Sequence, residues 1–296
     1  MVAFTRTIAL PRAEPRRAPL KLSLMHWWRN GHFPDFAEPT TFNELVQARK
    51  LNDRDPRLPL LADKIRVKEH VARRLGEEWV IPTLWHGTAL PERPDWPLPF
   101  VLKASHGCCQ CAFVRSGTDD WPAIRRRAHR WLKRRYGAIL DEWLYREIEP
   151  RLLVEPFIGR AGALPVDYKF FVFGGRAEFI QVDTEREHAH KRVIFDRRWR
   201  ALPCTLQFPI EHRRVAPPAS LPRMIEAAET LGRGFDFVRV DLYAVEERPM
   251  FGELSFYPGS GLDRFRPAEF DSLFGAHWLR ARALSSSWPP SADRGW

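Results

Sequence analysis

The most constraining feature of this chain is a pair of carboxylates in two otherwise mostly apolar runs, residues 238–245 and 250–256, that flank the short polar segment 246–249. Two apolar runs around a short polar segment predict a β-hairpin. With the turn centred on Glu247, Asp241 lies directly opposite Glu253 on the neighbouring strand. Two like charges in that position repel each other, so the pair requires a compensating partner.

Arg239 and Ser255 are also opposite each other in this register, and they share a face with the two carboxylates because side chains alternate along a strand. A hard cation such as Mg²⁺ between Asp241 and Glu253 would remove the repulsion, and the arginine beside them would suit phosphate. The simpler alternative is that Asp241 pairs only with Arg239 or lies in water at a strand edge. The hairpin alone leaves both interpretations open.

Composition limits the class of protein. A chain of 296 residues has room for about two domains, and its 44% hydrophobic and 12% aromatic content indicates a globular fold. The formal net charge of +10 favours anionic partners such as nucleotides, acidic polymers, nucleic acids or membrane surfaces. Segment 125–135 is strongly basic, but no nucleic-acid-binding motif surrounds it. We interpret it as a solvated face or a surface for a large anionic substrate, and expect no specific nucleic-acid binding.

Targeting signals are not evident. Residues 1–24 are basic and rich in proline without a sustained apolar run, and no stretch approaches the ~20 apolar residues of a membrane helix. We therefore expect a cytoplasmic protein without membrane insertion. Cys108, Cys109 and Cys111 would be free thiols in a reducing compartment. A metal site there is the less favoured interpretation, because no second cysteine pair completes it.

Helical and strand patterns together predict an α+β fold. Thr41 and Glu44 have the spacing of a capping box at the start of a helix. Gly174 and Gly175 form the turn of a second hairpin, which would set Lys169 opposite Ile180. The other expected elements are helices at residues 62–75, 119–136, 221–231 and 267–273, and strands at residues 80–82, 100–103, 111–115, 152–158, 168–173, 177–183 and 191–195.

Five charged residues lie at positions where the identity of the interaction partner would indicate a function. Lys64 and Lys68 are four apart, so on a helix they would share a face and could meet an anion or simply be solvated. Lys103 ends an apolar strand and needs a partner, which a phosphate could supply. Glu155 lies in another apolar strand and could accept from an adenine amino group or an arginine. Lys169 shares an aromatic face, which suits either a cation–π contact or a phosphate.

The order of these motifs resembles the ATP-grasp superfamily, and most closely its TupA-like branch, which is associated with teichuronopeptide synthesis. The matching segments are spread over about residues 40–275: TTFNE, ADKIRVKEHV with the following IP, FVLKASHG, VEPFI, DYKFFVF, FIQVD, RVDLY and FGELSFYPG. The resemblance implies an ATP-grasp fold, in which two α+β subdomains with antiparallel sheets clasp ATP.

The resemblance also implies residues that bind the nucleotide. Lys103, assisted by Lys64, would contact the α- and β-phosphates. Glu155 would accept from the adenine amino group, with the backbone at Phe157 in the hinge. His106 belongs to the turn HGCCQC, which would close over the phosphates, although the superfamily often has a loop rich in glycine and serine there.

For the metal and the chemistry, the resemblance implies that Asp241 and Glu253 hold Mg²⁺. Ser255 would be a third, weaker metal ligand at a position where peptide-ligase relatives often have asparagine. Arg239 would stabilise the transferring phosphoryl group. Lys169 matches the branch and is expected beside it.

The expected organisation is a basic leader at 1–24, an N-terminal α/β region at 25–99, a lid-like subdomain at 100–158, a core subdomain with the metal site at 159–284, and a disordered tail at 285–296. The implied activity is an ATP- and Mg²⁺-dependent carboxylate–amine ligase that acts through an acyl phosphate. Its expected substrate is an anionic small molecule or glycan tied to cell-surface polysaccharide. The alternatives are an ATP-grasp kinase for a sugar or small molecule, and a non-catalytic basic binding module.

Overall fold

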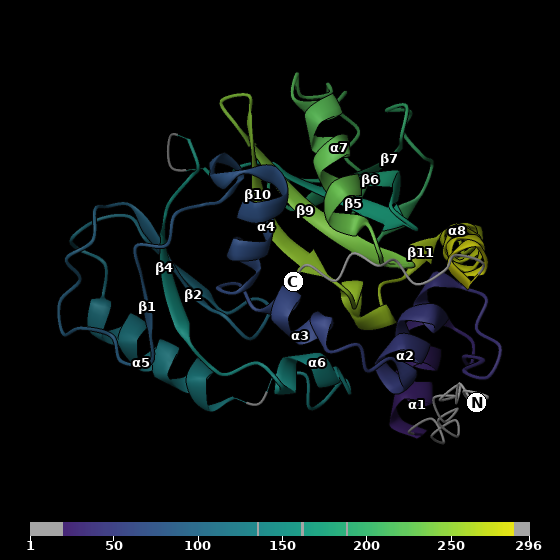
Figure 1. The fold of residues 1–296 in the computed structure, drawn as a ribbon, viewed down its shortest axis with the longest axis horizontal. Coiled ribbons are helices and arrows are strands. Elements are labelled where there is room, and N and C mark those ends of the chain that lie inside the picture. Colours follow the sequence, from purple (N-terminus) through teal and green to yellow (C-terminus); the bar gives the residue numbers. More distant parts are fainter. Residues whose placement is uncertain (1–19, 135, 161–162, 188, 287–296) are drawn as a thin grey trace, which may run out of the picture.

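The computed structural model describes residues 20–134, 136–160, 163–187 and 189–286 (Figure 1). Two antiparallel sheets dominate this part of the chain: a four-stranded sheet in the order β1-β4-β2-β3 and a five-stranded sheet in the order β10-β9-β5-β6-β7. The expected α+β fold with antiparallel sheets is confirmed. None of the helices in the described residues is long and apolar enough to cross a membrane.

The N-terminal third is helical. The capping box is confirmed, because the Thr41 side chain accepts from the backbone N–H of Glu44 and the Glu44 carboxylate accepts from that of Thr41. This box begins the helix Phe42–Asn52, which packs against the helix Glu269–Ser286. The helices in this region are α1 (Leu20–Asn30), α2 (Phe42–Asn52), α3 (Arg57–Ala62), α4 (Val67–Leu75) and the short 3₁₀ helix η1 (Glu77–Trp79).

The four-stranded sheet packs one face against α5 (Trp121–Lys133), where Trp121, Ile124 and Ala128 are buried against the strands. Asp120 caps this helix by accepting from the N–H of Ala123. In the basic segment, Arg126, Arg127, Arg130 and Arg134 are exposed. The opposite face of the sheet is not covered by α5 and contributes to the cleft. The elements are β1 (Trp85–Gly87), β2 (Phe100–Ala104), β3 (Cys111–Val114), α6 (Trp143–Arg146) and β4 (Leu152–Pro156).

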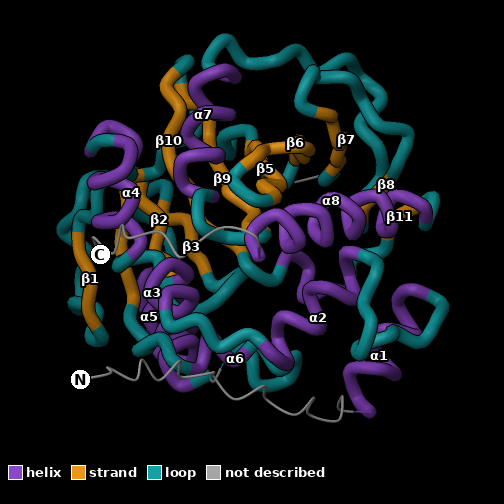
Figure 2. The backbone as a smooth tube through the Cα atoms, turned by 45° about the vertical axis from the view of Figure 1, so that its right-hand side comes forward, coloured by secondary structure: helices purple, strands orange, loops and turns teal. Residues whose placement is uncertain are grey.

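The five-stranded sheet has an apolar and a mixed face. α7 (Leu221–Gly232) packs on the face that carries Val238 and Val172 (Figure 1). On the other face, α2 and α8 (Glu269–Ser286) lie next to one end of the sheet (Figure 2), where Phe179 stacks on Phe274. The other end of this face is polar. The remaining elements are β5 (Asp167–Phe173), β6 (Arg176–Thr184), β7 (Lys191–Asp196), β8 (Thr205–Leu206), β9 (Phe237–Val245), β10 (Arg248–Ser255), η2 (Pro258–Gly261) and β11 (Phe265–Arg266).

The β9–β10 hairpin has the expected register at its carboxylates, because Asp241 pairs with Glu253. Its turn differs from the expectation. Glu246 and Glu247 form a two-residue turn, with φ of 49° and 65°. Two-residue turns that match the twist of a hairpin require such positive φ at both positions. The pairing then shifts at Gly252, where a bulge moves the register by one residue. The displaced turn and the bulge compensate each other.

In the β5–β6 hairpin a bulge has the opposite consequence. Gly174 and Gly175 form the expected turn, both with positive φ. The register then shifts beside Phe171, so that Lys169 pairs with Gln181. The predicted partner, Ile180, is therefore wrong by one residue, since a bulge has no signature in the alternation of this strand.

Several predicted boundaries are wrong. The helix expected at 62–75 is interrupted after Ala62 and resumes at Val67, because the Asp63 side chain accepts from the N–H of Ile65 and forms a turn. Residues 80–82 follow η1 and form no strand. The helix expected at 267–273 is much longer, and α1 occupies the end of the expected leader. The rest of the leader, 1–19, and the tail from 287 lie outside the described residues.

Candidate nucleotide-binding site

Lys103 and Glu155 lie on neighbouring strands of the four-stranded sheet, on the face turned away from α5. The Lys103 Nζ is 2.6 Å from Glu155 Oε2, and Lys68 of α4 places its Nζ 2.5 Å from Glu155 Oε1. Glu155 is buried, with 4% exposure. Burial opposes the charge of Lys103, but the carboxylate outweighs it and raises the pKa of Lys103. Glu155 is therefore shared by two lysines in this structure.

Lys169, Arg239 and Asp241 form a buried ionic cluster on β5 and β9. Asp241 is 1% exposed. Its Oδ2 accepts from Lys169 Nζ and Arg239 Nη2, each at 2.7 Å, and its Oδ1 accepts from Arg239 Nε at 2.7 Å. Asp167 is the second partner of Lys169, at 2.6 Å. Burial opposes the charge of Lys169, but Asp167 and Asp241 outweigh it and raise its pKa.

Glu253 and Lys64 connect the five-stranded sheet to the turn after β2. Lys64 Nζ lies 3.1 Å from Glu253 Oε2 and donates to the carbonyl of Gly107 at 3.1 Å. Burial disfavours the Glu253 carboxylate, but Lys64 and Lys169 outweigh burial and lower the pKa of Glu253 to about 2. The Glu253 side chain keeps 31% of its surface exposed. It is thus an ionised carboxylate that a ligand can reach.

The donor set of this cluster fits Mg²⁺. Asp241 and Glu253 are directly paired across β9 and β10 and share a face, so two hard oxygen donors converge. Ser255 adds a hydroxyl on the same face, although its Oγ accepts from Arg239 Nη2 at 3.0 Å. The carboxylates already have cationic partners from the chain itself. An incoming metal would therefore share or replace those partners.

An apolar pocket of about 150 Å³ lies next to Lys103 and Glu155. Residues from both sheets line it, among them Val101, Phe113 and Tyr243. A mostly apolar lining with a few polar groups is typical of sites that bind small organic ligands. Its other lining residues are Ile81, Cys111, Pro156, Phe157, Ile158, Leu164, Pro165 and Arg186.

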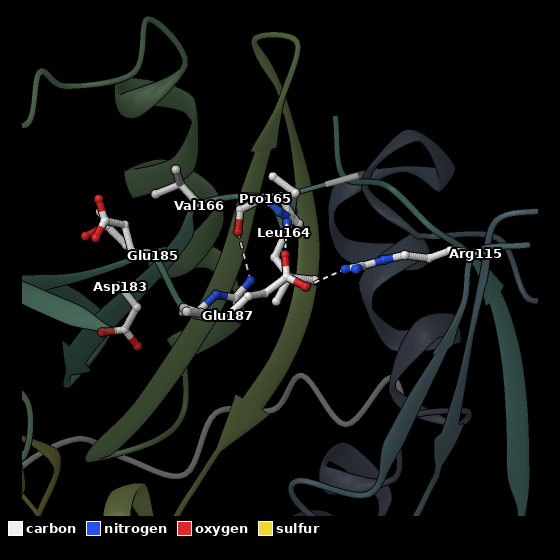
Figure 3. A pocket seen from close by; sticks show the side chains of 10 residues that line it. Arg115, Leu164, Pro165, Val166, Asp183, Glu185 and Glu187 are labelled. Atoms are coloured by element: carbon white, nitrogen blue, oxygen red, sulfur yellow. Dashed lines mark hydrogen bonds and ion pairs between the residues drawn. The ribbon is translucent and has the colours of Figure 1, made fainter. Parts of the chain in front are cut away.

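A larger cavity, of about 810 Å³, adjoins this pocket and shares Leu164, Pro165 and Arg186 with it. Figure 3 shows Arg115 reaching from the end of β3 to Glu187, in the segment after β6. This ion pair links the segment after β3 to the segment after β6, and both residues line the cavity. At this volume, the cavity is large enough for a small-molecule ligand beside the apolar pocket.

The remaining predicted residues lie at different depths. The Phe157 ring lines the apolar pocket, while its backbone N–H donates to the carbonyl of Pro99 at 3.0 Å. His106 is 1% exposed and its Nε2 lies 3.1 Å from the carbonyl of Trp131, so its ring is turned towards α5. Cys108 and Cys109 are exposed in the turn, with their sulfurs 3.5 Å apart.

Two residues of the cleft, Asp167 and Arg186, received no role from the sequence, and Lys68 was predicted only to share a helix face with Lys64. Asp167 and Lys169 are two apart on one strand, so their shared face is a signal that could have identified Asp167. Arg186 Nη1 contacts Asp167 Oδ2 at 3.1 Å from a loop, where no periodicity indicates its direction. Lys68 was expected beside Lys64 on one helix face. Because of the turn at Asp63, Lys64 contacts Glu253 whereas Lys68 contacts Glu155.

Comparisons with solved structures give distant similarities. D-alanine–D-alanine ligase from Bacillus anthracis, complexed with ATP, matches at 12% identity and a TM-score of 0.45, over 77% of this chain and 66% of that chain. N5-carboxyaminoimidazole ribonucleotide synthetase from Thermus thermophilus matches at 16% identity and a TM-score of 0.45, over 81% and 59%. The ATP-grasp ligase PsnB, complexed with its minimal precursor, matches at 10% identity and a TM-score of 0.41, over 80% and 68%.

This chain thus spans about two thirds or less of the first two of these ligases. No curated protein sequence matches it. The sequence model of the family described as TupA-like ATPgrasp, however, matches residues 44–279, which include every cleft residue described above. The chain therefore belongs to the TupA-like ATP-grasp family, and the ATP-grasp fold expected from its motifs is confirmed.

Proposed function

We propose that this protein is an ATP- and Mg²⁺-dependent carboxylate–amine ligase that acts through an acyl phosphate. Membership of an ATP-grasp family supports the nucleotide and the metal. The observation that carries the proposal is the convergence of lysines from both sheets on carboxylates beside an apolar pocket. Cations whose present partners are carboxylates can exchange them for phosphates, since both are oxyanions that accept from the same donors.

The apolar pocket would bind the adenine. Val101 and Phe113 offer apolar surfaces for the ring, and Glu155 is among the polar residues that line the pocket. Lys103 would contact the phosphates nearest the base. Because Glu155 has a second lysine partner in Lys68, it would remain charged and paired when Lys103 turns to a phosphate. Glu155 could then also accept from the adenine amino group.

The phosphoryl-transfer end would lie at Lys64, Arg239 and Lys169. Asp241 and Glu253 would hold Mg²⁺, which supplies charge neutralisation on the transferring group when it is bound. Arg239 points at the same carboxylates and would donate to the phosphoryl oxygens in the transition state. Its bidentate geometry suits a planar, charge-delocalised group.

The reaction would proceed in two displacements. A substrate carboxylate oxygen attacks the γ-phosphorus, the bond to the β-phosphate oxygen breaks, and ADP leaves. An amine then attacks the carbonyl carbon of the acyl phosphate, loses a proton, and expels inorganic phosphate to form an amide. The turn from His106 to Gln110, anchored by the Lys64 contact with the Gly107 carbonyl, would exclude water from this intermediate.

The large cavity beside the nucleotide pocket would take the second substrate. Arg115 and Arg186 line it, but so do Asp183, Glu185 and Glu187. The support for an anionic substrate is therefore the formal charge of +10 of the whole chain. On that ground we propose a carboxylate-bearing glycan or precursor of a cell-surface polysaccharide. ADP release that depends on an added amine would identify a ligase, whereas phosphate retained on the substrate would identify a kinase.

The test is calorimetry of Mg²⁺·ATP binding to the wild type and to the double variant Asp241→Asn/Glu253→Gln. We expect micromolar binding by the wild type, about −8 kcal/mol, and a strong loss in the variant. Glu247→Gln is the matched control, because it removes one carboxylate from the exposed turn of the same hairpin. Wild-type protein without Mg²⁺-dependent ATP binding would overturn the proposal.

A further inference from the structure

We propose a second metal site, outside the nucleotide cleft, in which His26, His32 and Glu44 bind a divalent transition metal such as Zn²⁺. His26 lies on α1, His32 in the loop that follows, and Glu44 in the first turn of α2. One nitrogen from each histidine and one carboxylate oxygen lie within 4.8 Å of one another. Two imidazoles and a carboxylate are a ligand set that Zn²⁺ commonly uses.

The separation of the two imidazole nitrogens fits a shared ion. His26 Nε2 and His32 Nε2 are 3.4 Å apart. Two nitrogens that each lie about 2.05 Å from Zn²⁺ at a tetrahedral angle are separated by about 3.3–3.4 Å. The distance from His32 Nε2 to Glu44 Oε1 is 3.9 Å, and a small rotation of the half-exposed His32 ring would shorten it.

The carboxylate is held in place from behind. Glu44 Oε2 accepts from the backbone N–H groups of Thr40 and Thr41, at 3.1 and 3.0 Å, and Oε1 accepts from that of Asp35 at 3.0 Å. Hydrogen bonds of this kind orient a metal ligand before the ion arrives. Oε1, the oxygen nearest His32, keeps a lone-pair direction for the metal, since Asp35 is its one hydrogen-bond donor among the described residues.

A fourth ligand would come from water. The His32 side chain is 48% exposed, and it lines a cavity of about 340 Å³ together with Thr41 and Asp271. The ion would join α1 and the loop after it to the start of α2, which packs on α8 and η2. Because none of these three ligands lies in the nucleotide cleft, we infer that the metal stabilises the fold.

Two simpler explanations compete with the metal. The 3.4 Å contact could be only a hydrogen bond between two neutral histidines. Alternatively, zinc added to the protein could bind the cysteines of the turn, Cys108, Cys109 and Cys111, which are exposed. The experiment has to separate both from the proposed site.

The test uses the full chain, freed of metal by dialysis against a chelator and then titrated with Zn²⁺ against a chromophoric competitor. We expect one ion per chain with His32→Gln lowering the affinity at least about 100-fold, since loss of an outer-shell partner alone costs 10–100-fold. His32 is exposed, so this variant should fold normally. His212→Gln replaces another exposed histidine and is the matched control, expected to bind as the wild type does.

Cobalt distinguishes the ligands. Co²⁺ in the proposed site should show the visible d–d absorption of a four-coordinate ion without a thiolate-to-cobalt charge-transfer band. Zn²⁺ should also raise the melting temperature of the wild type and not that of His32→Gln. The absence of zinc binding, or binding that survives His32→Gln and is lost on replacing Cys108, Cys109 and Cys111 by serine, would overturn the proposal.

Discussion

Asp241→Asn is the substitution that tests how the cleft is stabilised in the absence of a ligand. It preserves the shape of the side chain and removes one negative charge. The hairpin pattern alone indicates two repelling carboxylates, and repulsion predicts that removing one of them stabilises the protein. The structure indicates the opposite, because Lys169 and Arg239 donate three hydrogen bonds of 2.7 Å to Asp241.

The expected loss follows from those contacts. Asparagine keeps one acceptor oxygen, so at least one cation would face the amide NH₂ group. Breaking a buried ion pair costs about 3–5 kcal/mol. Lys169 retains Asp167 at 2.6 Å and Arg239 retains the Ser255 hydroxyl at 3.0 Å, which favours the lower end, about 3 kcal/mol. With an unfolding entropy of about 0.6 kcal/mol/K for a chain of this length, the melting temperature should fall by about 5 °C.

The assay is thermal unfolding followed by circular dichroism, with urea unfolding followed by tryptophan fluorescence, both without nucleotide. Glu247→Gln, in the exposed turn of the same hairpin, should change the free energy of unfolding by less than about 0.5 kcal/mol. An Asp241→Asn protein as stable as the wild type, or more stable, would refute the reasoning, because the carboxylates would then be repelling each other as the sequence alone suggests.

Three further predictions concern the same cleft. Lys103→Met should weaken ATP binding at least about tenfold in calorimetry, because a charge-assisted contact is lost. Against the effect of burial, neighbouring cations lower the pKa of Glu253 from 4.5 to about 2. The stabilising contribution of this carboxylate is therefore complete above pH 4.5 and is lost as pH falls towards 2. Between these pH values the urea midpoint of Glu253→Gln should change less than that of the wild type. Gly252→Ala should destabilise the fold by about 1–3 kcal/mol, since the new Cβ would lie 2.9 Å from the Asp241 carbonyl, while Gly117→Ala, with nothing within 4 Å, should be neutral in the same unfolding assay.

Much of the fold could be predicted from local signals. The capping box at Thr41 and the Gly174–Gly175 turn depend on residues that are adjacent in sequence, and both are present. The pairing of Asp241 with Glu253 was also predicted, but the prediction assumed a turn centred on Glu247 and no bulge. The turn lies half a residue from its expected centre, and the bulge at Gly252 restores the register. The equivalent bulge in the other hairpin receives no such compensation, which moved the expected partner of Lys169.

What could not be predicted depends on packing between distant segments. Lys68 reaches Glu155 only because the turn at Asp63 rotates α4 relative to the preceding segment. His26 and His32 are six residues apart and separated by the end of a helix, so no periodicity brings their rings together. Helix and strand periods give a direction along one element, whereas these contacts require the relative placement of several.

The charges of the cleft have a consequence for the metal. In the described part of the chain, six cationic side chains meet four carboxylates there, which leaves an excess of positive charge. The cations are Lys64, Lys68, Lys103, Lys169, Arg186 and Arg239, and the carboxylates are Glu155, Asp167, Asp241 and Glu253. Another cation added alone would increase this excess, whereas Mg²⁺ together with ATP brings net negative charge.

Mg²⁺ should therefore bind this cleft only together with the nucleotide. In thermal unfolding, millimolar MgCl₂ alone should shift the melting temperature by less than about 1 °C. Mg²⁺·ATP at about 100 times its Kd should stabilise the fold by about 2.7 kcal/mol, or about 4 °C for a chain of this length. Asp241→Asn should lose most of the second shift, while Glu247→Gln should retain it. A stabilisation of several degrees by MgCl₂ alone that disappears in Asp241→Asn would mean that Lys169 and Arg239 do not neutralise the carboxylates, because the metal would then be binding a site that is negative before ATP arrives.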